Sequence, residues 1–111
     1  MYSFQMQPDE QMLKKGLASL QAEDATLSGA IYLTDARLVF VGYLLGGPAI
    51  KKELSLPLTD ILSIRGGKTA FIIPNAVDIT PAGADPFRLI LRDRNAWLSA
   101  IRDQMSVHAG N

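Results

Sequence analysis

The sequence contains no cysteine, a single histidine and no net charge. Without cysteine the chain can form neither a disulfide framework nor a thiolate metal site, and it has no cysteine nucleophile. The eleven basic and eleven acidic residues cancel. The basic field that concentrates nucleic acid is therefore missing, and we expect no nucleic-acid partner. No apolar run approaches the roughly 20 residues that span a bilayer, so no transmembrane segment is predicted.

Groups for catalysis and for cofactor binding are also scarce. His108 stands outside any motif, and a lone histidine cannot build a metal site or a catalytic triad. The carboxylates Asp9 and Glu10 are neighbours along the chain rather than a pair opposed across a cleft, which favours charge at a helix end or in a solvated loop. The segments Gly46-Gly47-Pro48 and Gly66-Gly67-Lys68 lack the glycine spacing and the following helix of a phosphate-binding loop. We predict no catalytic, metal or cofactor residue, and a protein that is not an enzyme.

The length of 111 residues, with 48% hydrophobic and 20% charged residues, is typical of one globular domain. Residues 1–12 lack the basic and apolar regions of a secretory signal, and the absence of cysteine fits a reducing compartment. We therefore expect a single cytoplasmic domain over residues 1–111, with its core in residues 17–107 and an N-terminal extension in residues 1–16. In that extension, Pro8-Asp9-Glu10 followed by Lys14-Lys15 predicts a short N-terminal helix that Gly16 ends.

The clearest pattern lies in residues 28–43, where apolar and polar residues alternate on both sides of a short polar break. Alternation with a period of two around a turn predicts two antiparallel strands with one buried face. The segment Thr34-Asp35-Ala36-Arg37 supplies the turn, because Thr and Asp side chains accept hydrogen bonds from backbone N–H groups. We interpret Asp35 and Arg37 as a turn cap and a salt bridge. Gly29 and Gly42 indicate a bulge or a close approach of two backbones.

Five more segments carry strand patterns, namely residues 17–21, 51–58, 61–65, 71–80 and 87–91. Leu17 and Leu20 are expected to turn inward. Pro57 indicates an edge strand, or a strand that ends there, because proline cannot donate to a ladder. Residues 66–68 are expected to form a flexible connection. After the N-cap Asp93, an apolar stripe through Trp97 predicts a C-terminal amphipathic helix. About seven strands followed by one helix indicate a mainly β (α+β) fold, a strongly bent sheet or split barrel. We expect one core, made by Leu33, Leu38, Phe40, Leu56, Ile61, Ile79, Leu89, Leu91, Trp97 and Ile101.

Three landmarks, in this order, resemble the GRAM domain, here a bacterial-type stand-alone member of the pleckstrin-homology-like superfold. Residues 29–40 (GAIYLTDARLVF) resemble the strand–turn–strand signature of the family, residues 56–61 (LPLTDI) resemble its next landmark, and residues 87–101 resemble its last strand and capping helix. The resemblance implies a pleckstrin-homology-like split barrel of about seven antiparallel strands capped by a C-terminal helix. It also implies a non-catalytic module that binds phospholipid at a membrane surface. The alternative is a protein-interaction or self-assembly module.

One segment, residues 43–52, is more apolar than a surface loop usually is. In one interpretation, Leu44 and Ile50 tuck back under the rim of the barrel. In the other, the segment contacts an anionic phospholipid at the inner face of the membrane, a protein partner, or a second copy in a homo-oligomer. The candidate contact residues are Tyr43, Leu44, Leu45, Ile50, Lys51 and Lys52.

Overall fold

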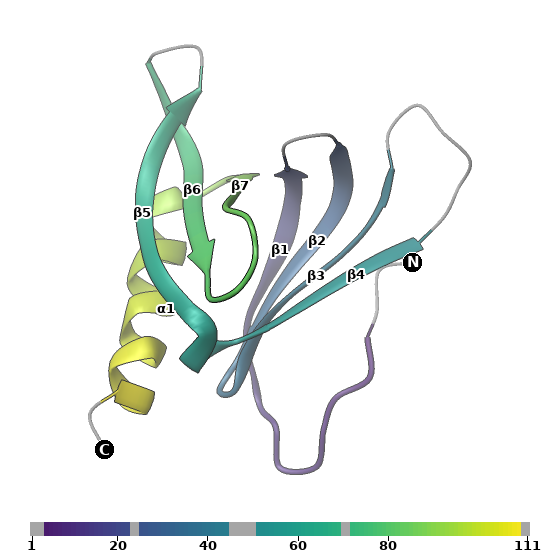
Figure 1. The fold of residues 1–111 in the computed structure, drawn as a ribbon, viewed down its shortest axis with the longest axis vertical. Coiled ribbons are helices and arrows are strands. Elements are labelled where there is room, and N and C mark those ends of the chain that lie inside the picture. Colours follow the sequence, from purple (N-terminus) through teal and green to yellow (C-terminus); the bar gives the residue numbers. More distant parts are fainter. Residues whose placement is uncertain (1–3, 23–24, 45–50, 70–71, 110–111) are drawn as a thin grey trace.

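The computed structural model describes residues 4–22, 25–44, 51–69 and 72–109 (Figure 1). Within them the chain forms seven antiparallel strands and one C-terminal helix, with a short 3-10 helix (Leu58–Asp60) between the fourth and fifth strands. The strands form a single sheet in the order β4-β3-β2-β1-β7-β6-β5. The predicted mainly β split barrel with a C-terminal helix is confirmed. The elements are β1 (Met12–Gln21), β2 (Thr26–Thr34), β3 (Arg37–Leu44), β4 (Lys51–Pro57), β5 (Ile61–Thr69), β6 (Ile73–Pro81), β7 (Phe87–Leu91) and α1 (Arg94–Ala109).

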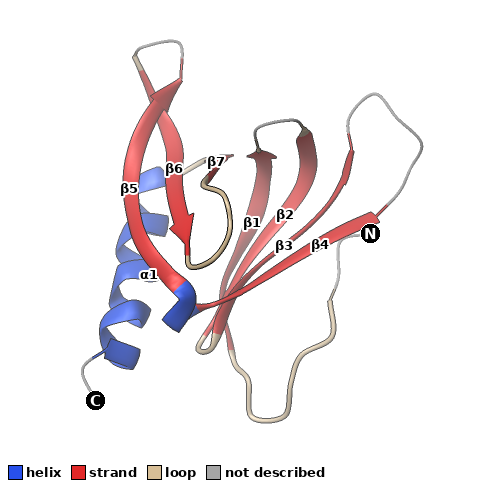
Figure 2. Ribbon diagram, in the orientation of Figure 1, coloured by secondary structure: helices blue, strands red, loops and turns tan. Residues whose placement is uncertain are grey.

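The sheet curls into a half-barrel, with β1–β4 on one side and β5–β7 on the other (Figures 1 and 2). The helix α1 packs against β5, β6 and the short 3-10 helix. The strand β4 lies at one edge of the sheet, as Pro57 predicts. Every residue of the predicted core is buried, and the helix contributes Trp97, Leu98 and Ile101 to it. The inward residues of the strands and the apolar stripe of the helix therefore pack into one core.

The β2–β3 hairpin forms as the sequence predicts. The hydroxyl oxygen of Thr34 accepts hydrogen bonds from the backbone N–H groups of Ala36 (3.1 Å) and Arg37 (3.0 Å). Gly29 and Gly42 lie directly opposite each other, and the register between the strands has no shift. The two glycines thus mark a close approach of two backbones rather than a bulge.

The close approach at Gly29 leads to a first prediction. A Cβ atom added there would collide with the carbonyl oxygen of Val41 and lie 2.5 Å from the Cα of Gly42. Because backbone atoms cannot rotate away, Gly29→Ala should lower the free energy of unfolding by about 3 kcal/mol, at the upper end of the cost of overpacking. Urea denaturation measures this. Gly83→Ala is the control, because its Cβ meets nothing within 4 Å and only its φ of 72° is unfavourable, at about 1 kcal/mol. Equal losses for the two variants would contradict the prediction.

The predicted N-terminal helix is wrong. A turn closed by a hydrogen bond from the N–H of Glu10 to the carbonyl of Gln7 (3.1 Å) occupies this region, and β1 begins at Met12. The N–H of Gln11 donates to the carboxylate of Asp35 (3.0 Å), and the following residues pair with β2. This pairing with a distant strand outweighs the helix-like pattern of local charges. Leu20 turns inward as expected, but the other inward residue of β1 is Ala18 rather than Leu17, which is 75% exposed.

The expected flexible connection at residues 66–68 is also wrong, because Gly66 and Gly67 lie inside β5. A Cβ at Gly66 would collide with the guanidinium of Arg94, which donates to the carbonyl of Gly67 (3.1 Å). A Cβ at Gly67 would lie 2.7 Å from the Asp78 carboxylate, which forms an ion pair with Arg88 (2.6 Å). These glycines make room for two arginine side chains packed against opposite sides of the strand.

Candidate binding site at the mouth of the half-barrel

A cavity of about 670 Å³ opens inside the curl of the sheet, between β3, β4 and the loop that joins β6 to β7. We call it the mouth cavity. Parts of the chain far apart in sequence line it: the end of β1 and the start of β2 with the adjoining Ala22 and Ala25, the first half of β4, and the start of β7. Its lining residues are Leu20, Ala22, Ala25, Leu27, Phe40, Lys52, Glu53, Leu54, Asp85, Pro86 and Phe87.

The wall of the mouth cavity is largely apolar. Phe40 and Leu54 are paired across β3 and β4, and a Cβ at Gly42 would lie 2.8 Å from the Phe40 ring. The ring thus packs closely against the glycine backbone. Leu54 is 38% exposed, whereas Leu56, two residues further along β4, is only 8% exposed. The same inward face of β4 therefore changes from core to cavity wall. The volume lies within the roughly 300–1,000 Å³ of typical ligand pockets.

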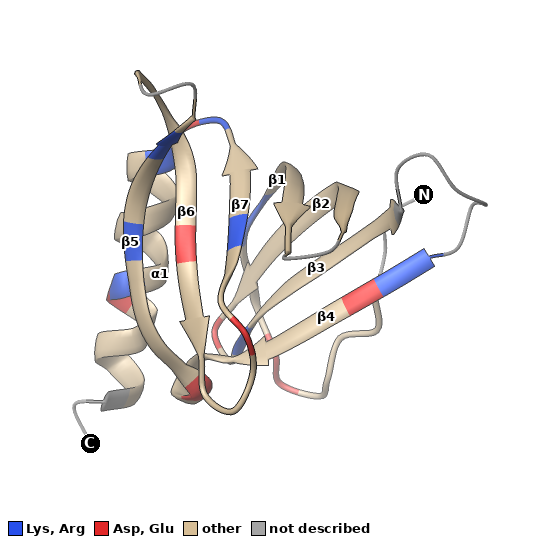
Figure 3. Cartoon of the chain, turned by 45° about the horizontal axis from the view of Figure 1, so that its top comes forward, with Lys and Arg blue, Asp and Glu red and all other residues tan. Residues whose placement is uncertain are grey.

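Charged residues lie beside this apolar wall and nearly balance. Lys51 and Lys52 begin β4 and are exposed, and Glu53 follows them directly. Asp85 adds a second carboxylate from the loop before β7. Figure 3 shows the basic and acidic residues in succession on β4. A small basic patch thus borders an opening whose overall charge is close to neutral.

The structure brings only part of the predicted contact segment to the mouth cavity. Lys52 lines the cavity, and Tyr43 is half-buried on β3 opposite Lys51. Leu44 ends β3, whereas Leu45 and Ile50 lie outside the described residues. Sequence reasoning missed the apolar wall, because inward residues of a strand look alike whether they end in the core or in a cavity. The edge position that Pro57 indicates was the available signal that β4 is less covered.

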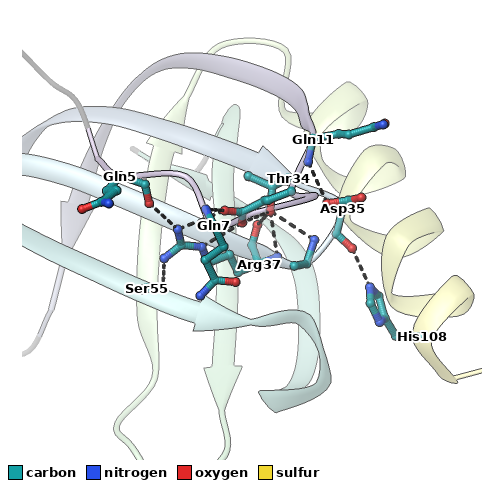
Figure 4. Close-up of polar contacts among 10 residues, drawn as sticks. Gln5, Gln7, Gln11, Thr34, Asp35, Arg37, Ser55 and His108 are labelled. Atoms are coloured by element: carbon teal, nitrogen blue, oxygen red, sulfur yellow. Dashed lines mark hydrogen bonds and ion pairs between the residues drawn. The ribbon is translucent and has the colours of Figure 1, made fainter.

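Apart from the mouth cavity, a cluster of polar side chains joins the N-terminal segment, residues 4–11, to the β2–β3 hairpin (Figure 4). The carboxylate of Glu10 forms an ion pair with the guanidinium of Arg37 (2.8 Å), and the side chains are 1% and 12% exposed, respectively. Glu10 also accepts a hydrogen bond from the Thr34 hydroxyl (2.6 Å). Arg37 donates further to the carbonyl of Gln5 (2.8 Å) and to the Ser55 hydroxyl (2.9 Å). We call these five residues the Glu10 cluster.

The Glu10 cluster corrects two expectations. Glu10 is not charge at a helix end or in a solvated loop. Arg37 forms a salt bridge as expected, but with Glu10, and the Asp35 carboxylate accepts from the N–H of Gln11 while Thr34 caps the turn. The hydrogen bond from Arg37 is the main cause that lowers the pKa of Glu10 from 4.5 to about 2, against the opposing effect of burial. Such an ionised, fully bonded carboxylate is suited to holding a segment in place rather than to proton transfer. His108 contacts the same hairpin, donating from Nε2 to the carbonyl of Asp35 (2.6 Å).

The described residues offer neither a cluster suited to a metal ion nor a helix suited to a membrane. In the part of the chain that the structure describes, no group of three or more histidine, cysteine or acidic side chains is placed to hold a metal ion. Among the same residues, no helix is both long and apolar enough to cross a membrane.

Comparison with known proteins gives consistent structural neighbours. At a TM-score of 0.70 and 20% identity, the chain is similar to the C-terminal domain of an unknown protein from Leishmania infantum, covering 86% of this chain and 84% of that one. The chain is also similar to the pleckstrin homology domain of human pleckstrin homology domain-containing protein family A member 5. The TM-score is 0.55 at 14% identity, and the match covers 93% of this chain and 84% of that one. For the linker-DH/PH domains of p115-RhoGEF, the TM-score is 0.63 at 15% identity, and the match covers 89% of this chain but only 30% of that one.

At these identities, the solved structures establish the fold alone, which is pleckstrin-homology-like. A search of curated proteins finds no match. The family profile described as the GRAM domain matches residues 1–94. Domains of this kind typically bind lipids or proteins and are generally not catalytic. The chain belongs to the GRAM domain family.

Proposed function

We propose that the protein is a non-catalytic module that attaches reversibly to membranes by binding phospholipid at the mouth cavity. The observation that carries this proposal is an apolar wall next to two exposed lysines, Lys51 and Lys52. The wall suits the apolar part of a lipid, and the ammonium groups suit the phosphate of its headgroup. We place such a protein, as part of the same proposal, in the cytoplasm and peripheral at the inner face of the membrane.

The expected affinity is modest. Each lysine near an anionic surface contributes about 1 kcal/mol, and full burial of a Leu or Phe side chain contributes about 1.5–3 kcal/mol. Leu54 is already 62% covered in the protein alone, since it is 38% exposed, so only part of that gain remains. Glu53 and Asp85 oppose an anionic surface. The sum supports reversible binding that weakens with salt, because exposed charges are screened.

The second prediction tests the lysines. Lys51→Glu combined with Lys52→Glu should weaken binding to vesicles of phosphatidylcholine with phosphatidylserine at least about 30-fold, because it removes about 2 kcal/mol of attraction and adds repulsion. Vesicle flotation at low and high salt measures this. The matched control is Arg65→Glu with Lys68→Glu, which makes the same change of charge on exposed residues of β5 and should leave binding within about twofold.

A second variant tests the cavity. Leu54→Asp places a carboxylate at a partly exposed position of the wall, where it should weaken vesicle binding while thermal unfolding changes little. If the vesicles bind the parent and all these variants alike, or bind none of them, the proposal is wrong. Light scattering tests the alternative occupant: a homo-oligomer that Leu54→Asp dissolves would identify the mouth as a self-assembly surface.

A further inference from the structure

The first strand is paired along only part of one side. β1 pairs with β2 from Met12 to Gln21, but with β7 only from Ala18 to Gln21. β7 ends at Leu91, opposite Ala18, and the chain then turns into α1 at Arg94. Within the described residues, the stretch 12–17 therefore has a strand on one side only. Its backbone N–H and C=O groups on the other side are available to a further strand.

A groove of about 970 Å³ runs beside this unpaired edge. We call it the β1 groove. One wall is β1 from Lys14 to Ser19, and the other is formed by the connection from β7 to α1 with Trp97. Pro74 and Asn75 of β6 contribute as well. The β1 groove shares no residue with the mouth cavity, so it is a separate site.

The β1 groove is basic as well as apolar. Lys15 and Arg92 are exposed, and the ammonium of Lys14 lies 5.2 Å from the centre of the Trp97 ring. Asp93 is the only acidic residue among those that line the groove. Leu17 lines the groove as well and is 75% exposed. Figure 3 shows basic residues on β1 and just beyond the end of β7.

We propose that the β1 groove binds an extended acidic peptide segment of a partner protein, which adds to β1 as a strand in line with β7. The unpaired backbone groups supply the hydrogen bonds of the new ladder, the general mode of strand addition at a sheet edge. Alternate peptide side chains lie on the face of Leu17 and Lys15, where carboxylates meet Lys15 and Arg92. The others face the Trp97 side. Charge complementarity selects an acidic peptide, and the ladder selects an extended backbone over a lipid.

The probe is a blocked seven-residue peptide of alternating glutamate and valine. Trp97 is the only tryptophan, so its fluorescence and calorimetry both report binding. The acidic peptide should bind at least about tenfold more tightly than the matched lysine–valine peptide. A glutamate–valine peptide with proline at its centre should bind about tenfold more weakly, since proline cannot donate to the ladder. On binding, amide exchange should slow within residues 12–17.

The matched variants are Lys15→Glu with Arg92→Glu, which should weaken peptide binding about tenfold, and Arg65→Glu with Lys68→Glu, which should not change it. The Lys15/Arg92 variant should bind vesicles like the parent, so this inference and the lipid proposal can fail separately. No binding of the acidic peptide, equal binding of acidic and basic peptides, or binding without amide protection at the edge would overturn the inference. Loss of vesicle binding in the Lys15/Arg92 variant would instead assign the β1 groove to the membrane.

Discussion

Glu10→Ala is expected to lower the free energy of unfolding by about 3–5 kcal/mol. This is the usual cost of removing one partner of a buried ion pair, because the other charge is left without compensation. Arg37 is 12% exposed and would lose its carboxylate at 2.8 Å, and the Thr34 hydroxyl would lose its acceptor at 2.6 Å. The variant would therefore leave the partly buried guanidinium without its counter-charge and the buried Thr34 hydroxyl with only the longer hydrogen bond to the carbonyl of Arg37 (3.3 Å).

The Glu10 cluster also holds the N-terminal segment across the sheet. The Phe4 ring packs on Tyr32, with 5.0 Å between ring centres, and on the guanidinium of Arg37 at 5.1 Å. Val39 and Val41 alternate with the inward residues of β3 and lie outside the main core cluster, yet they are fully buried. We infer that the segment covers them. Loss of Glu10 should loosen this cover and expose apolar surface.

Urea denaturation of Glu10→Ala, Arg37→Ala and the double variant measures the coupling between the two side chains. Asp103→Ala is the control, since Asp103 is an exposed carboxylate on α1, and it should change stability by less than about 0.5 kcal/mol. A Glu10→Ala loss as small as that of the control would mean that the ion pair does not hold the segment.

The ion pair between Glu10 and Arg37 also makes the stability depend on pH. The pKa of Glu10 is lowered from 4.5 to about 2 in the folded protein, so its stabilising contribution is fully present above pH 4.5. It is lost as the pH falls from 4.5 towards 2, where the folded protein takes up the proton. At 1.36 kcal/mol per pKa unit the contribution is about 3 kcal/mol. Glu10→Gln should flatten the dependence of stability on pH in this range, and an unchanged pH profile would show that another group carries it.

Features decided by neighbouring residues could be predicted from the sequence. The β2–β3 hairpin follows from alternation on both sides of Thr34, whose hydroxyl bonds the turn locally. The core residues follow from the same alternation together with the apolar stripe of α1. In these cases the structure of each segment is determined by residues within one strand, hairpin or helix, and contacts with the rest of the chain do not change it.

Features decided by distant partners could not be predicted. The charges around Asp9 and Lys14 match a short helix, but from Met12 onward this stretch pairs with β2. Glu10 forms its ion pair with Arg37, which lies 27 residues away in the sequence. The mouth cavity has a similar origin, since Leu54 and Leu56 face the same way on β4 and differ only in how far the curled sheet covers them. No pattern in the sequence of β4 shows which of its inward residues the curled sheet covers.

Trp97→Ala is the other change with a large expected effect, a loss of about 3–5 kcal/mol in the free energy of unfolding. Trp97 is 4% exposed and joins α1 to the core together with Leu98 and Ile101. Its ring also lies against β1, because a Cβ at Gly16 would lie 3.3 Å from Cζ2. Gly16 has no side chain to move into the space that alanine leaves, so the cavity should persist.

Circular dichroism should follow this unfolding, because the variant has no tryptophan fluorescence. Trp97→Phe keeps most of the ring and should lose only about 1–2 kcal/mol, while Ser99→Ala, at an exposed position of the same helix, should stay within about 0.5 kcal/mol. Trp97 is the helix residue that lines the β1 groove. Trp97→Phe should therefore also weaken the binding of the acidic peptide, but less than the Lys15/Arg92 variant does. A Trp97→Ala protein as stable as Ser99→Ala would mean that α1 is held to the sheet mainly by Leu98 and Ile101, and that the ring serves the groove alone.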